Sequence, residues 1–289
     1  MSNQKERDSN PVVTGLGEVL WDMFPDGSRL GGAPANFAAH AAALGADAFL
    51  VSAVGNDPLG DQTIEMLDRL QVNHDNVARN SHPTGTVEVE ISGGNPVYDI
   101  TTEVAWDFCI WNHVLEQLAE STDAVCFGTL FQRSETNRET TKRFLNATRP
   151  GCLRVFDVNL RQNFYSNEMI VESLKLANVL KLNEDELPVV ANAIGIQCHF
   201  ELSPKEILER FDLKMVALTC GSGGSHLFTP GGHDFCAAEP VNVIDTVGAG
   251  DSFTAAVVIG MLGDQPLEKL HQTASQNAAK VCGQAGAGL

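Results

Sequence analysis

Residues 245–253, Asp-Thr-Val-Gly-Ala-Gly-Asp-Ser-Phe, combine a glycine-rich turn with a carboxylate at the start of an apolar run. Gly248 and Gly250 allow backbone conformations that a side chain would forbid, so successive N–H groups can converge on an anion where the next helix begins. Asp251 would lie beside that anion. The segment therefore has the residue types to hold a phosphate group and to accept the proton of an alcohol.

Transfer of a phosphoryl group from ATP to an alcohol needs positioning, charge neutralisation and a proton acceptor. An ionised aspartate, with an ordinary pKa of about 4, would take the proton as the new bond forms. The position of Asp251 early in a helix favours its ionised form. The alternative is a tight turn in which Asp251 only interacts with the helix dipole. The P-loop pattern is absent, and Gly15-Leu16-Gly17 lacks the third glycine of a dinucleotide fingerprint.

The charge of the chain excludes one class of partner. With 19 basic and 37 acidic residues, the 289-residue chain has a formal charge of −18, which would repel a nucleic acid backbone. A phosphorylated substrate would need local positive potential from a few basic residues, backbone N–H groups and bound metal. The 43% of hydrophobic residues suffice for a substantial core.

The expected location is a reducing compartment, because the seven cysteines are odd in number and form no C-x-x-C pair. Residues 1–10 are polar and predict a disordered leader, since they lack the apolar core of a signal peptide. No apolar run reaches the roughly 20 residues of a membrane helix. These features predict a soluble, cytoplasmic protein with no membrane partner.

The fold class is predicted to be α/β, with a mostly parallel central sheet between layers of helices, because short apolar runs alternate with helical patterns. The expected strands are Val12–Leu16, Ala48–Val54, Ala124–Phe127, Arg154–Val158, Val179–Leu182 and Val216–Thr219. The expected helices are Ala35–Leu44, Asp61–Leu70, Trp111–Ala119, Glu135–Ala147, Ile170–Leu176, Glu184–Ala193, Pro204–Phe211, Ser252–Leu262 and Leu267–Cys282.

One stretch departs from this alternation. Residues 84–91 and 97–101 are two alternating segments separated by Gly93-Gly94-Asn95-Pro96, which predicts a β-hairpin. With residues 20–30 it would form a small sheet that covers a pocket as a lid. Alternatively, it is an edge hairpin of the main sheet.

Candidate sugar ligands lie near the N-terminus. Gly31 and Gly32 permit close backbone approach to a ligand, and Asn36 can donate and accept hydrogen bonds. An ordinary loop and helix start is the alternative. Glu18 and Asp22 follow the first strand, where ligand-binding loops of open α/β sheets gather, and they either anchor hydroxyl groups or are solvated acids.

Three further candidates follow strands in the middle of the chain. Arg161 either grips a phosphate or lies on the surface. Asn183 and Glu186 have the spacing of one face of a helical first turn, where oxygen ligands could hold a water-rich Mg²⁺ ion beside ATP. Helix capping by Asn183 would also explain that pair.

The glycine-rich segment from Thr219 to Ser225 suits a loop that lies against a nucleotide, although a plain hairpin turn has the same composition. Asn277, on the last predicted helix, could border an adenine.

Four motifs, in chain order, resemble those of the ribokinase-like (PfkB) sugar kinases: Gly31-Gly32-x3-Asn36, Asn183-x2-Glu186, Thr219-x-Gly221-x2-Gly224 and the turn from Asp245 to Phe253. The match extends from about residue 12 to the C-terminus. This resemblance implies one kinase domain over residues 11–289, a three-layer α/β/α sandwich, and a small β lid from segments at about 20–30 and 84–103.

The resemblance also implies roles for individual residues. By position, Asp251 matches the catalytic base and Gly248, Ala249 and Gly250 match an anion hole. The family's sugar contacts match Asp22, Gly32 and Asn36. Its Mg²⁺ pair matches Asn183 and Glu186, and its nucleotide loop matches Thr219, Gly221 and Gly224. Family members often carry potassium near the loop that begins at Asp245, and they often form homodimers through their lids.

The stretches Gly17–Asp22, Gly31–Phe37, Val104–Asp107 and Phe156–Arg161 resemble bacterial fructokinases, which implies phosphorylation of D-fructose to fructose 6-phosphate. A kinase for 2-keto-3-deoxygluconate or ribose would use the same machinery. No residue from Thr84 to Glu103 is Lys or Arg, which favours a neutral sugar. A silent sugar or nucleotide sensor is the third reading, against which the intact Asp251 and glycine turn argue.

Overall fold

Two β-sheets organise the chain in the computed structural model, which describes residues 9–24, 27–92 and 95–289. Residues 1–8 of the predicted leader lie outside the described residues, as do Gly93 and Gly94 of the predicted hairpin turn. None of the helices in the described part of the chain is long and apolar enough to cross a bilayer.

The larger sheet has nine strands in the order β13-β12-β11-β10-β9-β8-β1-β4-β5. Their bounds are β1 Val12–Leu16, β4 Asp47–Gly55, β5 Val77–Asn80, β8 Ala124–Phe127, β9 Leu153–Asp157, β10 Val179–Asn183, β11 Met215–Thr219, β12 Ser225–Thr229 and β13 Gly232–Cys236. The seven strands from β5 to β11 pair in parallel, and β12 and β13 complete one edge as antiparallel strands. Parallel strands are buried on both faces, which explains the near-continuous apolar runs in the sequence.

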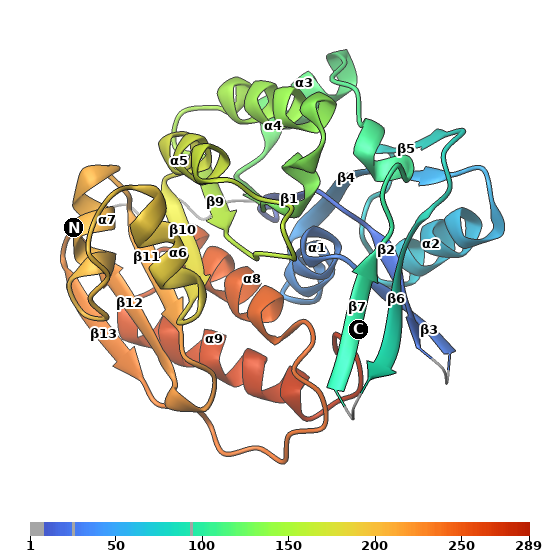
Figure 1. The fold of residues 1–289 in the computed structure, drawn as a ribbon. Coiled ribbons are helices and arrows are strands. Elements are labelled where there is room, and N and C mark those ends of the chain that lie inside the picture. Colours follow the sequence, from blue (N-terminus) through green and yellow to red (C-terminus); the bar gives the residue numbers. More distant parts are fainter. Residues whose placement is uncertain (1–8, 25–26, 93–94) are drawn as a thin grey trace.

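Helices cover both faces of this sheet (Figure 1). Their bounds are α1 Ala33–Ala43, α2 Pro58–Arg69, α3 His113–Ser121, α4 Glu135–Ala147, α5 Asn167–Leu176, α6 Glu186–Ala193, α7 Ser203–Arg210, α8 Ala249–Leu262 and α9 Leu267–Cys282. Side chains of α1, α2, α8 and α9 belong to one core cluster, and those of α3 to α7 belong to the other. The predicted three-layer α/β/α arrangement is confirmed.

Local sequence sets several of the helix starts. The side chains of Asn112, Ser134 and Ser166 accept hydrogen bonds from backbone N–H groups in the first turns of α3, α4 and α5. Gly45 follows the end of α1 with φ +93°, and Gly263 caps α8.

The smaller sheet has four strands in the order β3-β2-β6-β7, and it stands apart from the main sheet (Figure 1). Its strands are β2 Leu20–Phe24, β3 Gly27–Gly31, β6 Gly85–Ser92 and β7 Asn95–Ile100. The predicted hairpin is β6 and β7, and it joins the segment at residues 20–30 through parallel pairing of β2 with β6. The alternative, an edge hairpin of the main sheet, is wrong.

The base of the smaller sheet is held against α2 by hydrogen bonds. Asp57, the N-cap residue of α2, accepts from the backbone N–H of Gly60 and also from the N–H and hydroxyl groups of Thr84, one residue before β6. The indole of Trp21 on β2 donates to the hydroxyl of Thr63 on α2 at 2.9 Å. These hydrogen bonds fix the smaller sheet to α2 and so set its position beside the candidate site.

Candidate active site

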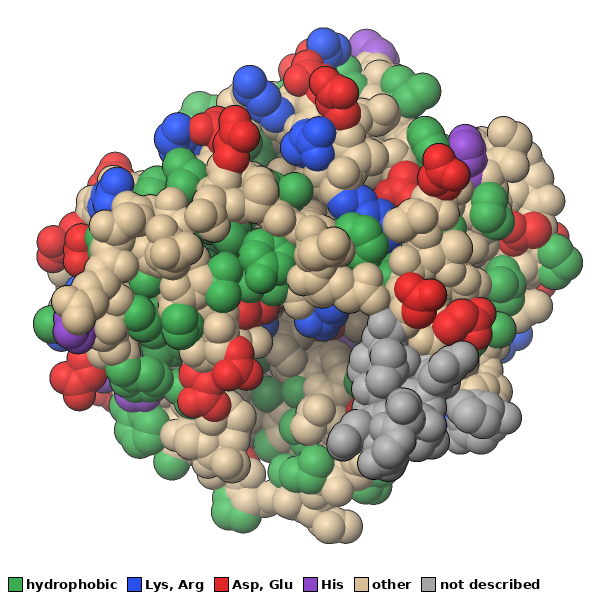
Figure 2. Space-filling view, in the orientation of Figure 1, with side chains coloured by type: hydrophobic (Ala, Val, Ile, Leu, Met, Phe, Trp, Pro, Cys, Tyr) green, Lys and Arg blue, Asp and Glu red, His purple; other side chains and the backbone are tan. Residues whose placement is uncertain are grey.

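A cavity of about 1070 Å³ lies between the smaller sheet, the carboxyl ends of the parallel strands and the starts of α1 and α8. Figure 2 shows it as a hollow with both basic and acidic side chains on its walls. Leu20, Val87 and Ile100 of the smaller sheet line one side of it. The volume exceeds that of a typical single-ligand pocket, so two ligands can share it.

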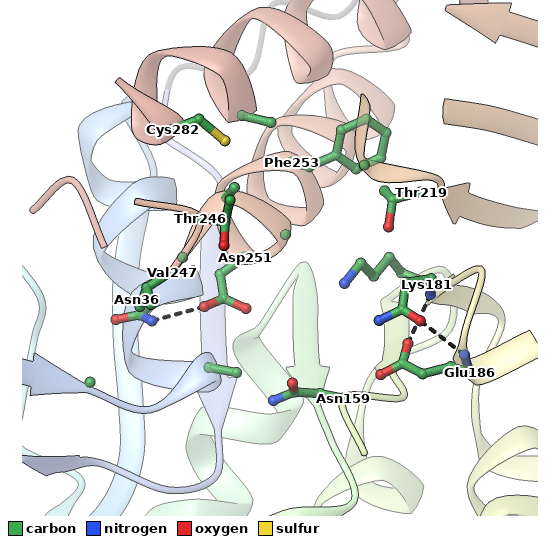
Figure 3. A pocket seen from close by; sticks show the side chains of 18 of the residues that line it. Asn36, Asn159, Lys181, Glu186, Thr219, Thr246, Val247, Asp251, Phe253 and Cys282 are labelled. Atoms are coloured by element: carbon green, nitrogen blue, oxygen red, sulfur yellow. Dashed lines mark hydrogen bonds between the residues drawn. The ribbon is translucent and has the colours of Figure 1, made fainter. Parts of the chain in front are cut away.

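Asp251 faces this cavity from the first turn of α8 (Figure 3). Its Oδ2 accepts a hydrogen bond of 2.8 Å from Nδ2 of Asn36 on α1. Burial raises the pKa of Asp251 to about 6, and the neighbouring Asp157 adds to this, while Asn36, Lys181 and Arg161 oppose it. The sequence predicted an ordinary pKa of about 4, and burial outweighs the helix dipole.

Lys181 on β10 brings a positive charge to the same place. Its Nζ lies 3.1 Å from Oδ1 of Asp157, and a Cβ atom added to Gly250 would meet that Nζ at 2.9 Å. Burial alone would lower the pKa of Lys181, but Asp157 and Glu186 hold it above its usual value. In Figure 3 the ammonium and the carboxylate of Asp251 extend toward the same space.

Lys181 is not among the site residues predicted from the sequence, although the sequence contains a signal for it. Lysine and aspartate are rarely buried unless they are paired, and Asp157 ends the strand β9 while Lys181 is the middle residue of β10. Two opposite charges in adjacent buried strands predict an ion pair between them.

The glycine turn is shaped by contacts with the C-terminal tail. Gly248 has φ +75°, and a Cβ atom there would lie 2.7 Å from both Cα and Cβ of Ala287. The carboxylate of Asp245 accepts from the N–H groups of Val247 and Gly286, at 3.0 and 2.9 Å. Of the amides predicted to bind an anion, that of Ala249 already donates to the carbonyl of Thr246, at 3.3 Å.

Asn183 and Glu186 adopt the reciprocal geometry of a cap. Asn183 Oδ1 accepts from the N–H of Glu186 at 2.9 Å, and Glu186 Oε2 accepts from the N–H of Asn183 at 2.8 Å. Glu186 Oε1 accepts from the N–H of Leu160 at 3.0 Å. Both residues also line the cavity. Because a carboxylate has about four acceptor positions, Glu186 has capacity left for a metal ion or its water ligands.

At the opposite wall, two glycines lie close to neighbouring atoms. A Cβ atom on Gly31 would lie 2.7 Å from Oδ2 of Asp22, and one on Gly32 would lie 2.4 Å from the carbonyl oxygen of Glu18. Burial raises the pKa of Asp22 to about 6 and that of Glu18 to about 7. Among the described residues, Glu18 Oε2 and Asn36 Oδ1 are buried without a hydrogen-bond partner.

The predicted nucleotide loop also lines the cavity, at Thr219, Gly221 and Gly224. It connects the antiparallel strands β11 and β12, so it is also the hairpin turn of the alternative interpretation. A Cβ atom on Gly224, whose φ is +96°, would lie 2.3 Å from the carbonyl oxygen of Cys236.

Of the remaining predicted residues, one lines the cavity and two do not. Arg161 lines the cavity from an exposed position. Within the described part of the chain, Asn277 and Asp245 are not on its wall. Asn277 donates to the carbonyl of Thr273 in its own helix, at 2.9 Å, whereas Ser275 of that helix does face the cavity. Among the described residues, there is no group of three or more histidine, cysteine, aspartate or glutamate side chains that could hold a metal ion.

The sequence of this chain is similar to those of known sugar kinases. The pfkB family carbohydrate kinase pattern matches residues 17–289. The uncharacterized sugar kinase PH1459 from Pyrococcus horikoshii is 30% identical over 277 residues, which cover 90% of this chain and 85% of that protein. A fructokinase from Salmonella typhimurium is 27% identical over 95% of this chain and 92% of its own length.

Solved structures with the same fold hold the ligands that such a cavity suggests. PH1459 in complex with ATP has a TM-score of 0.81 and 29% identity, covering 96% of this chain and 94% of that one. A Ribokinase II from E. coli was solved with ATP and Mg²⁺ (TM-score 0.81, 21% identity, 96% and 94% covered). A double-mutant fructokinase from Vibrio cholerae O395 was solved with fructose, ADP and potassium (TM-score 0.82, 23% identity, 98% and 96% covered).

Gly248→Ala is predicted to displace the C-terminal tail. Alanine at positive φ costs about 1–2 kcal/mol, and here its Cβ would also collide with Ala287. Gly45→Ala is the matched control, because Gly45 has φ +93° with nothing within 4 Å of an added Cβ. Hydrogen exchange at the Gly286 amide should accelerate only in Gly248→Ala. Equal exchange in the two variants would contradict this contact.

Proposed function

The chain belongs to the pfkB family of carbohydrate kinases, and we propose that it transfers the γ-phosphoryl group of Mg-ATP to the 6-hydroxyl of D-fructose. The observation that carries this proposal is the buried carboxylate of Asp251 at the glycine turn, beside the amide of Asn36. The two groups line the cavity from the first turns of α8 and α1.

Asp251 is the proposed proton acceptor. A base is most effective when its pKa lies near the working pH, and a pKa of about 6 leaves Asp251 mostly ionised at neutral pH. A primary hydroxyl that hydrogen-bonds to Asp251 would lose its proton as its oxygen attacks the γ-phosphorus atom, and ADP would leave with the electron pair of the broken bond.

Charge on the transferring group requires a cation in the site. Lys181 supplies one, because its Nζ lies next to Gly250 on the cavity wall. The first turn of α8 adds backbone N–H groups that the helix itself leaves unpaired. Arg161, at the exposed part of the wall, is the proposed second cation.

Glu186 is the proposed contact for Mg²⁺, with Asn183 fixing its orientation. Magnesium usually keeps several waters and takes one or two carboxylates together with substrate phosphates, so a single carboxylate on the cavity wall fits. When bound, Mg²⁺ would neutralise charge on the phosphates. The proposed role of Asp245 is to hold the tail against the turn, where backbone carbonyl groups would take potassium.

The buried groups at the other wall fit a polyhydroxy ligand. Glu18 Oε2 and Asn36 Oδ1 are acceptors without partners among the described residues, and buried acceptors of this kind need a donor. Sugar hydroxyl groups would supply it, with Asp22 as a third acceptor. Because Leu20, Val87 and Ile100 contribute apolar contacts, we infer that the smaller sheet acts as a lid that excludes water from the reaction.

Replacement of Asp251 by Asn is predicted to lower kcat by about 10² to 10⁴, because it removes the proton acceptor. Binding of ATP should persist. Asp264→Asn is the matched control, since Asp264 is an exposed residue just beyond the other end of α8. Turnover of Asp251→Asn equal to that of the control would refute the proposed base.

The proposed role of Asp251 as the base also predicts how kcat/KM changes at acidic pH. The base must be ionised, so kcat/KM of the wild-type enzyme should fall about tenfold per pH unit below the pKa of about 6 of Asp251. A profile that stays level from pH 7 to pH 4.5 would be inconsistent with this role.

Fructose is predicted to be the preferred acceptor in a panel with ribose, 2-keto-3-deoxygluconate, glucose and adenosine, each with and without potassium, with ADP release as the readout. Arg161 on the wall favours the acid sugar 2-keto-3-deoxygluconate as the second candidate. A higher kcat/KM for another sugar would overturn the fructose assignment. Silence on every acceptor would favour the sensor interpretation.

A further inference from the structure

Three side chains form a chain of hydrogen bonds at the end of the cavity formed by β12 and α9. His271 Nδ1 lies 2.5 Å from Oδ2 of Asp234, and His271 Nε2 lies 2.8 Å from Oγ of Ser225. They come from α9, β13 and β12. His271 has no exposed surface, and Ser225 is 4% exposed but lines the cavity.

The carboxylate of Asp234 determines which group donates in each of these hydrogen bonds. An ionised carboxylate accepts only, so Nδ1 of His271 must carry the proton that Asp234 receives. Burial lowers the pKa of His271 below its usual value against the opposing effect of Asp234, so the ring is neutral at pH 7. Nε2 is then an acceptor, and the hydroxyl group of Ser225 donates its only proton to it.

Ser225 therefore offers only lone pairs to the cavity. Ser275 Oγ lies 3.3 Å from Ser225 Oγ and can donate to one of them. A hydroxyl oxygen has two acceptor positions, so one remains in either case. A ligand atom at Ser225 must be a hydrogen-bond donor, because another acceptor there would face an unpaired lone pair.

The surroundings identify which part of the substrate reaches this point. Ser275, Ala278 and Ala279 of α9 line the cavity together with the loop at Gly221 and Gly224. That loop joins β11 to β12, and Figure 1 shows these two strands on the opposite side of the molecule from the smaller sheet, which carries the proposed sugar contacts. We propose that Ser225 is a specificity-determining residue that accepts a hydrogen bond from the 6-amino group of adenine, and that Asp234 and His271 are positioning residues that keep it an acceptor. This inference rests on the proposed use of ATP.

The proposal implies discrimination between purines that differ at one position. ATP carries an amino donor at position 6, whereas ITP carries a carbonyl acceptor there. A site built to accept a donor rejects the analogue without it, because a buried polar group is left unpaired. Binding of ATP by the wild-type chain should be about tenfold tighter than binding of ITP, or more.

The test is calorimetric titration of the full chain with Mg-ATP and with Mg-ITP in the absence of sugar. Ser225→Ala should reduce the ratio of the two affinities to near 1. Asp234→Asn should also lower the ratio, because an amide that donates to Nδ1 would leave the proton on Nε2, where it donates to Ser225 and frees the serine hydroxyl to donate. Ser173→Ala is the control and should keep the wild-type ratio. Ser173 is a buried serine of α5, and its hydroxyl accepts a hydrogen bond from Gln132.

The possible outcomes distinguish the role of Ser225, the positioning role of Asp234 and the use of ATP. Equal affinity of the wild-type chain for ATP and ITP, or an unchanged ratio in Ser225→Ala, would overturn the role of Ser225 and leave the sugar kinase proposal intact. A ratio that falls in Ser225→Ala but not in Asp234→Asn would overturn the positioning role of Asp234. Absence of any nucleotide binding would overturn the proposed use of ATP together with this inference. A purely structural role of the three residues would change stability but not the ratio.

Discussion

The buried pair of Lys181 and Asp157 is the constraint on which the site depends. Their strands, β10 and β9, are neighbours, and the two charged groups meet at 3.1 Å. The other oxygen of Asp157 accepts from the hydroxyl of Thr254, which lies 2.9 Å from the carbonyl of Gly250. The pair therefore fixes the start of α8 relative to the sheet. Such pairs are weak evidence for stability, and here the consequence is position: the glycine turn, the cation and the base are set against one another.

The same arrangement sets the protonation of the base. A second cavity of about 10 Å³, room for about one water, is lined in part by Glu18, Asp157 and Asp251. Burial among carboxylates raises the pKa of Asp251, and the positive charge of Lys181 opposes that rise. Without the cation, Asp251 would bind its proton more tightly and would be a poorer acceptor at neutral pH. Without the burial, the pKa of Asp251 would be lower and the carboxylate would be a weaker base.

Much of this fold could be predicted from the sequence, because the parallel strands are buried on both faces and the helices have clear periods and caps. The apolar runs from Val12 to Leu16 and from Ala124 to Phe127 match β1 and β8 residue for residue. Strands β5, β12 and β13 were not predicted. Both β5 and β13 are short edge strands with exposed residues, so their patterns carry little hydrophobic signal.

The candidate site was predictable where local spacing determines it, as in the glycine turn and the Asn183–Glu186 cap. It was not predictable where distant segments meet. The raised pKa of Asp251 depends first on its burial by the folded chain and then on Asp157, 94 positions earlier. The choice between Ser275 and Asn277 depends on the rotation of α9 about its axis, and the sequence did not specify which face of that helix meets the cavity.

We propose that the 6-hydroxyl of fructose receives the phosphoryl group beside Asp251. The decisive measurement is ³¹P–¹H correlation NMR of the product formed from Mg-ATP and fructose. One new phosphate ester, coupled to the methylene protons at C6, is expected. A phosphate ester at C1 or on a ring hydroxyl, or inorganic phosphate as the only product, would contradict it.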